Sequence, residues 1–362
     1  MARSKVAVLK TSPESVVEDY GRLMELAGFR EHLPQDKDTL LKINISWHHY
    51  FPACSTTPWQ LEGVTKALGD AGYKNLIPAQ NRTVVVDPKV GAKRNHLESV
   101  VEKYGMEFKY LYEPDVKWIK YEPKHPMLVL DKVFPDGIII PECFIGKNAV
   151  HLPTVKTHVF TTMTGAMKNA FGGLLRENRH WTHSVIHETL VDLLAIQKEI
   201  HPGIFAVTDG TIAGDGPGPR AMVPHIKNYI LASADQVAID AVSATLMGFD
   251  PMDLKFIRLA HEAGLGCGEV KELEMVGDDI SEVNFHFHAK QETFASRGQK
   301  MIYHGPLKPL ENFLLRSPIA PWSYYASRLY HDGYWYPFIG KPRVHQILQS
   351  EWGKLFRSYG GK

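Results

Sequence analysis

The feature that most constrains this chain is an alternation of short apolar runs with longer segments whose apolar side chains recur at helical spacing. Strand-length runs separated by helices are typical of parallel sheets that are covered on both faces. Thr57 followed by Pro58 is a typical helix start. We therefore expect an α/β fold with mostly parallel sheets and helices on both faces. The strand candidates are residues 5–10, 39–46, 76–80 or 83–86, 137–142, 148–153 and 204–210, and the helix candidates are residues 12–28, 56–75, 184–200 and 235–248.

Three segments are expected along the 362 residues. Residues 1–150 form an N-terminal α/β lobe, residues 151–280 a second lobe rich in lysine and histidine motifs, and residues 281–362 an extension. The two lobes are expected to flank a cleft. Eleven of the 42 residues from 321 to 362 are aromatic, a density too high for a solvated linker. This aromatic C-terminal arm is expected to pack on the body or on a second copy in a homodimer. The alternative is a lid that places His331 and Asp332 near the site.

Composition excludes several classes of protein. The formal charge of +1 gives no global field that would attract nucleic acid or an acidic membrane, so neither is an expected partner. No apolar run is long enough to cross a bilayer and no secretory signal begins the sequence, so we expect a cytoplasmic protein. Cys54, Cys143 and Cys267 are too scattered for a zinc ribbon or a four-cysteine cluster, so no iron–sulfur cluster is expected from this chain.

The stretch HLPTVKTHVFTTMTGAMKNAFGG, residues 151 to 173, runs from a strand candidate directly into cations and hydroxyls. Ligands of open α/β sheets bind beyond the carboxyl ends of strands, which puts Lys156 and His158 at the mouth of the cleft. We expect both to be catalytic. The alternative is that Lys156 is a surface cation.

The same stretch continues through a polar turn into a helix that begins near Ala166. Backbone N–H groups at a helix start attract an anion, and the hydroxyls of Thr162 and Thr164 add donors. Lys168 and Asn169 follow within the first turns and are expected to face the same ligand, with Lys168 positioned for acid–base work. The pattern predicts a receptor for a carboxylate or phosphate. The alternative is that Lys168 is a surface cation and the threonines only cap a helix.

Three histidines follow at spacings of three and four residues: His180, His183 and His187. On one helix they would form a single stripe, which could bind a transition metal through imidazole nitrogens. The alternative is a proton relay in which His180 and His183 are catalytic. If the helix begins only at Thr182 or His183, His180 leaves the stripe. Arg179 could contact an anionic substrate group or face water.

Acidic and basic residues cluster again after the strand candidate that ends at Asp209. The loop GDGPGPR contains Asp215 and Arg220 among turn-forming residues that allow close approach to a ligand. We expect Asp209, Asp215 and Arg220 to bind substrate, with a rigid surface loop as the alternative for the last two. Asp235 is expected to cap a helix, and Asp240 to partner a lysine or histidine.

The other side of the cleft is expected to come from the strand candidate at residues 39–46. Lys42 and Asn44 lie on this strand and are expected to bind substrate. His48 and His49 follow it, either in the cleft or in a polar loop.

Two family resemblances follow from these motifs. The chain resembles the uncharacterised family catalogued as domain of unknown function 362. The resemblance rests on LKINIS with TTPWQLEGVTKALGDAGYKN, on LPTVKTH, TGAMKNAFGG, RHWTH and LVDL, and on VTDG, GDGPGPR and LASADQVAIDAVSATLMGFDP. This resemblance covers roughly residues 38 to 280. It implies relatives with an added ferredoxin segment, from which this chain departs. THVFTTMTGAMK is also similar to a block of the lactate racemase family, whose two α/β domains set histidines and lysines around a nickel-bearing cofactor. That resemblance favours proton-transfer chemistry.

Together these patterns predict an enzyme that acts on a small anionic or polar metabolite through lysine and histidine acid–base chemistry, of isomerase or lyase type. Assistance by a transition metal at His180, His183 and His187 is part of this hypothesis, and the cofactor is otherwise unknown. The alternatives are a ligand- or cofactor-binding protein without turnover, and a redox accessory protein.

Overall fold

A computed structural model describes residues 3–289, 291–316 and 321–361, so residues 290, 317–320 and 362 of the predicted extension lie outside the described residues. The main feature of the described residues is a ten-stranded sheet with the order β12-β1-β11-β10-β7-β2-β3-β4, in which β8 pairs with β10 and β9. The strands are β1 (Lys5–Lys10), β2 (Thr39–Ile43), β3 (Leu76–Gln80), β4 (Lys109–Tyr110), β7 (Asn148–Leu152), β8 (Thr154–His158), β9 (Thr162–Met163), β10 (Ile204–Asp215), β11 (Val223–Ser233) and β12 (Glu274–Gly277), and β5 (Trp118–Tyr121) pairs with β6 (Ile138–Pro141) in a separate hairpin.

The sheet is mixed and mostly parallel, as predicted. Strands β2, β3, β4 and β7 run parallel to their neighbours, and β8 is parallel to β10 but antiparallel to β9. Strand β11 is antiparallel to both β1 and β10. Strand β7 lies between β2 and β10, so one continuous sheet runs through both of the predicted lobes.

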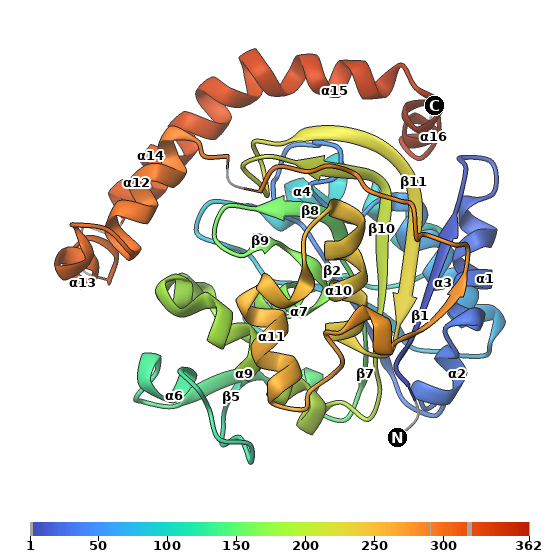
Figure 1. Ribbon diagram of the computed structural model, residues 1–362, viewed down its shortest axis with the longest axis horizontal. Coiled ribbons are helices and arrows are strands. Elements are labelled where there is room, and N and C mark those ends of the chain that lie inside the picture. The colour runs from blue at the N-terminus through green and yellow to red at the C-terminus, as the bar shows by residue number, and fades with distance from the viewer. Residues whose placement is uncertain (1–2, 290, 317–320, 362) are drawn as a thin grey trace.

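Helices cover both faces of the sheet, which confirms the predicted α/β class (Figure 1). Alternate side chains of β1 enter two different cores: Val6 and Val8 pack with α9 and α10, and Ala7 and Leu9 pack with α1 and α3. The helices of the body are α1 (Val16–Leu26), α2 (Phe29–His32), α3 (Pro58–Asp70), α4 (Pro88–Arg94), α5 (Leu97–Lys103), α6 (Leu130–Val133), α7 (Gly165–Asn169), α8 (Phe171–Leu174), α9 (Ile186–Ile200), α10 (Gln236–Met247) and α11 (Lys255–Glu262).

Local sequence signals explain why the longer helices begin where they do. Thr57 and Gln60 form a reciprocal capping box at the start of α3, with Pro58 in the first turn. Asp235 accepts hydrogen bonds from the first N–H groups of α10, and Gly248 ends that helix at a φ of 95°. The segment at residues 83–86 forms an isolated bridge, so the strand at this point of the chain is residues 76–80.

The C-terminal extension is helical and wraps over one end of the body (Figure 1). Its last part packs on the body: Trp335, Trp352 and Phe356 are buried in the core that contains α1 and α3. Tyr359 also donates a hydrogen bond to Glu62 of α3. Its helices are α12 (Phe294–Tyr303), α13 (Glu311–Arg316), α14 (Pro321–Arg328), the π-helix η6 (Leu329–Gly340), α15 (Lys341–Leu348) and α16 (Glu351–Ser358). None of the described helices is long and apolar enough to cross a membrane.

Candidate functional site

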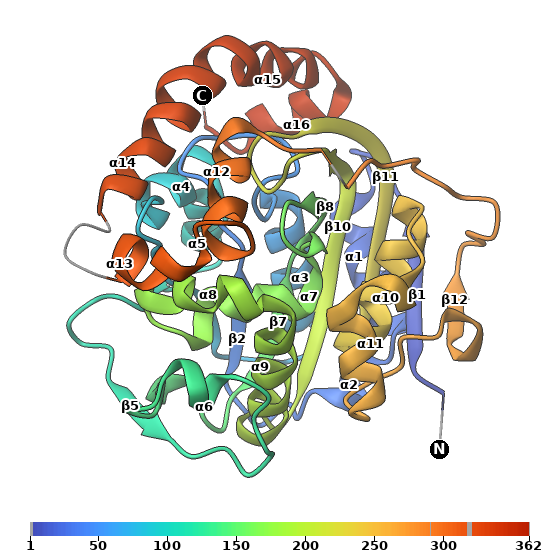
Figure 2. The same ribbon diagram turned by 60° about the vertical axis from the view of Figure 1, so that its left-hand side comes forward.

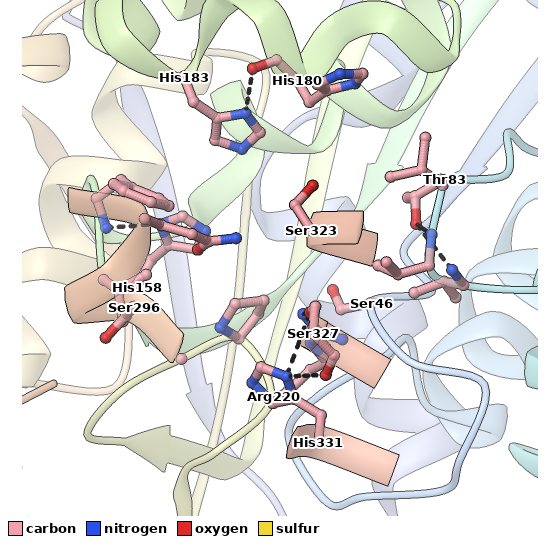
Figure 3. A pocket seen from close by; sticks show the side chains of 18 of the residues that line it. Ser46, Thr83, His158, His180, His183, Arg220, Ser296, Ser323, Ser327 and His331 are labelled. Atoms are coloured by element: carbon pink, nitrogen blue, oxygen red, sulfur yellow. Dashed lines mark hydrogen bonds between the residues drawn. The ribbon is translucent and has the colours of Figure 1, made fainter. Parts of the chain in front are cut away.

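A cavity of about 890 Å³ lies between the sheet and the C-terminal helices. Its floor comes from β2, β8, α7 and the loop after β10, and its outer wall from α12, α14 and η6. Figure 3 shows His180 and His183 at one end of the cavity and Arg220, Ser327 and His331 at the other. A volume of this size is typical of a site for a metabolite or cofactor.

The lining of this cavity carries an excess of positive charge. Among its described side chains are four lysines and arginines, Lys42, Lys168, Arg179 and Arg220, but one carboxylate, Glu177. Glu177 already accepts a hydrogen bond from Arg82 at 2.5 Å, outside the lining. Because buried charge is costly without a counterion, the four cations favour an anionic ligand.

Lys42 and Lys168 enter the cavity from different elements. Lys42 of β2 is fully buried and donates to the carbonyl oxygen of Ile43 and to Oε1 of Gln80. Burial, with Arg179 nearby, holds the pKa of Lys42 well below its usual range.

Lys168 of α7 has no hydrogen bond or carboxylate partner among the described residues, and its Nζ lies 5.1 Å from the ring centre of Phe171. Burial, followed by the charges of Lys156 and Arg179, lowers its pKa to about 7. An amine with such a pKa is protonated in about half of the molecules near neutral pH, which suits acid–base work.

The two arginines of the lining are also without a carboxylate partner among the described residues. Arg179 is buried and donates to backbone carbonyl oxygens, including that of Arg82 at 2.7 Å. Burial lowers its pKa to about 10. Arg220 donates through Nη2 to the hydroxyl of Ser327 at 3.3 Å, while its buried Nη1 has no partner among the described residues. Buried guanidinium groups that lack a carboxylate partner are well suited to bind a planar anion.

His158 and His183 are held in opposite tautomers. The backbone N–H of Phe160 donates to Nδ1 of His158 at 3.2 Å, so the neutral ring carries its proton on Nε2. Nδ1 of His183 lies 2.8 Å from the carbonyl oxygen of His180, which can only accept, so His183 donates from Nδ1 and keeps a lone pair on Nε2 (Figure 3). His158 therefore offers a donor, and His183 a basic nitrogen.

Both imidazoles are neutral over a wide pH range. Burial and the charge of Lys168 lower the pKa of His183 to about 3 and hold the pKa of His158 well below its usual range. His180 is tied to its surroundings: its Nδ1 lies 3.0 Å from the carbonyl oxygen of Glu177, and its Nε2 lies 3.2 Å from the hydroxyl of Tyr324.

The prediction that a ligand anion binds at the start of the helix near Ala166 is wrong. A carboxylate of the chain itself occupies this position, because Asp240 of α10 accepts hydrogen bonds from the N–H groups of Ala166 at 2.5 Å and Met167 at 3.0 Å. Gly165 allows this approach: it has a φ of 76°, and a Cβ atom there would overlap the Asp240 carboxylate. Asp240 therefore caps α7 and has no lysine or histidine partner among the described residues. Burial raises its pKa to about 7.

Several predicted site residues do line the cavity, and others lie outside its lining. Thr164 lines it with its hydroxyl near the carbonyl oxygen of Lys156, and Asn169 lines it while donating to the carbonyl oxygen of Lys42 at 2.8 Å. Asn44 also lines the cavity. Thr162 lies in β9 at a φ of 68°, outside the lining.

Lys156, Asp209 and Asp215 form structural contacts away from the cavity. Lys156 is completely buried and donates to Thr154 and to the carbonyl oxygen of Cys54. Burial lowers its pKa to about 8. Asp215 accepts from the backbone N–H of His288 at 2.6 Å. These contacts fix the sheet and the loop before α12.

The position expected for Asp209 is wrong because the strand does not end there. β10 continues to Asp215, so Asp209 lies inside the sheet. Its carboxylate accepts from Thr57, Trp59 and Thr211, which binds the start of α3 to the sheet. Burial raises the pKa of this carboxyl group.

The three histidines predicted to form a metal-binding stripe are not brought together among the described residues. His180 and His183 belong to the 3₁₀-helix η2 (Glu177–Val185) and line the cavity. His187 belongs to α9, which begins at Ile186, and packs on Phe256 outside the lining. The change of helix type breaks the spacing of three and four residues that the stripe required.

The described side chains that do resemble a ligand set are His48, His49 and Asp332, whose donor atoms all lie within 4.8 Å of one another. Trp47 donates to Asp332 at 2.7 Å, and Arg94 donates to Nδ1 of His49 at 2.8 Å. Since arginine cannot accept a proton and adds positive charge, this cluster suits an attachment between η6 and the body better than a cation site.

Sequence reasoning missed part of the lining. Gln80 ends β3, next to the strand that carries Lys42, so the rule that ligands bind at strand ends could have found it. Tyr303 and Ser327 come from the C-terminal helices, where no motif marked them. His331 also lines the cavity, as the lid alternative expected.

Comparison with known proteins gives a family match and one partial relative. Residues 39–245, more than half of the chain, match the family described as Domain of unknown function (DUF362). The thylakoid-associated protein sll1697 of Synechocystis sp. (strain ATCC 27184 / PCC 6803 / Kazusa) is 29% identical over 123 residues, which are 32% of this chain and 37% of that protein. The match thus covers little more than a third of this curated relative. No solved structure matches the chain significantly.

Proposed function

We propose that this chain, which belongs to the family described as Domain of unknown function (DUF362), is a cytoplasmic enzyme that moves a proton on a small anionic metabolite. The observation that carries the proposal is the combination of four basic side chains, without a carboxylate partner among the described residues, and two imidazoles in opposite tautomers around one cavity. The fold alone supports no particular reaction.

In this proposal the cations bind the anionic group of the substrate. Arg220, whose Nη1 has no partner among the described residues, and Arg179 are suited to a carboxylate, which would also offset the excess of positive charge in the lining. The bound anion would stabilise the protonated forms of nearby bases and so raise their pKa values. The proton-transfer groups would therefore become active only when substrate is present.

Three side chains then take part in the proton transfer: His183 as the base, and Lys168 and His158 as hydrogen-bond donors. The lone pair on Nε2 of His183 removes a proton from the carbon next to the carboxylate or carbonyl of the substrate. The electron pair moves to the carbonyl oxygen, where protonated Lys168 and the Nε2–H of His158 stabilise the enolate. Return of a proton to the carbon completes an isomerisation, and loss of a leaving group completes an elimination.

Deuterium exchange tests the reaction class without knowledge of the natural substrate. Purified protein is incubated in D₂O with a panel of 2-hydroxy, 2-oxo and 2-amino carboxylates, and mass spectrometry measures deuterium at carbon. We expect exchange into one class, and, at substrate concentrations too low to fill the site, an exchange rate that changes with pH near 7, where Lys168 of the ligand-free protein titrates. Lys168→Met should reduce the rate about 100-fold or more.

The matched control is Lys93→Met, which replaces an exposed lysine in the last turn of the short helix α4. Exchange that survives in Lys168→Met would contradict the assigned role of this lysine.

A ligand-binding protein without turnover is the second candidate, favoured by the size of the cavity and its aromatic outer wall. It predicts a bound anionic molecule in native mass spectra of the purified protein, no deuterium exchange into any carboxylate, and loss of the bound molecule in Lys168→Met.

A further inference from the structure

Exposed large apolar side chains are concentrated on the C-terminal helices. Nine of the sixteen exposed large apolar side chains in the described part of the chain lie between residues 294 and 338. Some are almost fully exposed: Phe294 is 84% exposed, Leu329 75%, Tyr325 71% and Phe338 70%. An apolar surface of this density normally marks an interaction site.

These side chains form a continuous edge. α14, η6 and α15 follow one another without a break. Trp322 and Tyr325 of α14 and Leu329, the first residue of η6, are spaced by three and four residues, which places them on one helical face. Tyr334 follows Leu329 at the five-residue spacing of the π-helix, and Phe338 follows four residues later, with the ring centres of Tyr334 and Phe338 5.8 Å apart. Figures 1 and 2 both show α12, α13 and α14 at one end of the molecule.

The apolar edge also borders the cavity on the side of the C-terminal helices. Phe294, Met301, Trp322, Leu329 and Tyr334 line the cavity and are at the same time exposed, so they form its rim. Whatever covers this surface therefore also covers the entrance to the site.

The charge of the same segment indicates the kind of partner. Residues 292–343 contain seven lysines and arginines and three acids, whereas the rest of the chain contains 34 basic and 37 acidic residues, from totals of 41 and 40. Within this segment Glu292 pairs with Arg297 and Lys300, and Glu311 pairs with Lys308. Arg328 and Lys341 are exposed beside the apolar edge. A second copy of the chain related by two-fold symmetry would bring two such basic surfaces together, which is unfavourable.

We propose that the surface formed by α12, α13, α14 and η6 docks on an anionic lipid bilayer, with the rim of the cavity in the interfacial layer. Exposed Trp, Tyr and Phe next to Lys and Arg are the combination by which helices lie in the membrane interface without crossing it. The near-neutral charge of the whole chain conceals this local basic surface. The docking does not depend on the reaction proposed above.

Vesicle co-sedimentation of the full chain tests the proposal. We expect the protein to sediment with vesicles of phosphatidylcholine mixed with phosphatidylglycerol, and less so as salt is raised. The double variant Tyr325→Ser/Phe338→Ser removes two exposed rings that do not line the cavity, and should weaken binding by about tenfold or more. The matched control Leu26→Ser/Val90→Ser, on α1 and α4, should bind like the wild type.

Three results would overturn the proposal. One is a failure to sediment with anionic vesicles. The second is equal binding to pure phosphatidylcholine. The third is a dimer in solution that Tyr325→Ser/Phe338→Ser dissociates, which would make this surface a subunit interface. Deuterium exchange measured without vesicles should be the same in the double variant as in the wild type, so failure of docking and failure of the proposed reaction are distinguishable.

Discussion

Replacing Lys168 by methionine should stabilise the protein, and more strongly at low pH. The lysine carries a charge into a lining that offers it no carboxylate among the described residues, and its pKa falls from 10.5 to about 7. Methionine keeps a similar volume and can still contact the ring of Phe171. The substitution therefore removes the cost of the buried charge and little packing.

The pH dependence gives the magnitude. The folded pKa of Lys168 lies below the unfolded value, so the unfolded chain binds the proton more tightly, and the charge costs stability fully below pH 7 and not at all above about pH 10.5. Each pKa unit corresponds to about 1.4 kcal/mol. The stability gained by Lys168→Met should therefore shrink by roughly 2–3 kcal/mol between about pH 6 and about pH 9.

Urea unfolding followed by tryptophan fluorescence at both pH values measures this difference. Wild type, Lys168→Met and the exposed-lysine control Lys93→Met are compared at each pH, so that every other titrating group contributes equally. A stability difference that does not change with pH would refute the reasoning. It would mean that Lys168 is not charged inside the cavity, or that a counterion neutralises it.

Three further predictions concern stability, each measured by urea unfolding. Gly165→Ala should lose roughly 2–4 kcal/mol, because its Cβ atom would displace the Asp240 carboxylate at a positive φ; an unchanged stability would contradict the close approach. Asp209→Asn should lose a similar amount, roughly 2–4 kcal/mol, because an amide cannot accept from all of the donors around it. Its deuterium exchange should match the wild type, and a selective loss of exchange would return Asp209 to the site. Acid should destabilise the fold as pH falls below 6.5, because burial lowers the pKa of His151 to about 3 and of His201 to about 4; flat stability from pH 7 to pH 5 would exclude neutral burial of these rings.

The sequence was sufficient for elements whose signals are local. The capping residues Thr57 and Asp235 sit at the helix starts that they predicted, and the apolar run before Lys156 is a buried strand. The α/β class follows from such elements. Of the candidate site, Lys42 and His158 were found from their place on or at the end of a strand candidate, and Lys168 from the polar turn and helix start that follow. His180 and His183 were found from their spacing.

The sequence-based predictions failed where the local structure depends on contacts with distant parts of the chain. The sequence around Gly165 predicted a free helix start, but Asp240, 74 residues further along, occupies the N–H groups of this helix. Asp209 marked the end of an apolar run, yet pairing with β11 extends the strand to Asp215. Long-range pairing cannot be read from a window of a few residues.

The outer wall of the cavity was the least predictable part. η6 is a π-helix with Pro337 inside it, so the helical period of the surrounding residues is lost. The aromatic content indicated that this segment packs against something, but it did not indicate which side chains face the cavity.

The cavity is assembled from two sections of the chain, of which only one lies within the region that matches the family. Every cation and imidazole assigned to the proposed reaction lies within residues 39–245, the region that matches the family, whereas the wall made by α12, α14 and η6 lies beyond it. Exchange of one terminal segment can thus alter which molecules gain entry, and on which cellular surface the protein works, while the reacting groups stay as they are. Grafting a different tail after residue 289 is for the same reason a direct route to altered selectivity on this scaffold.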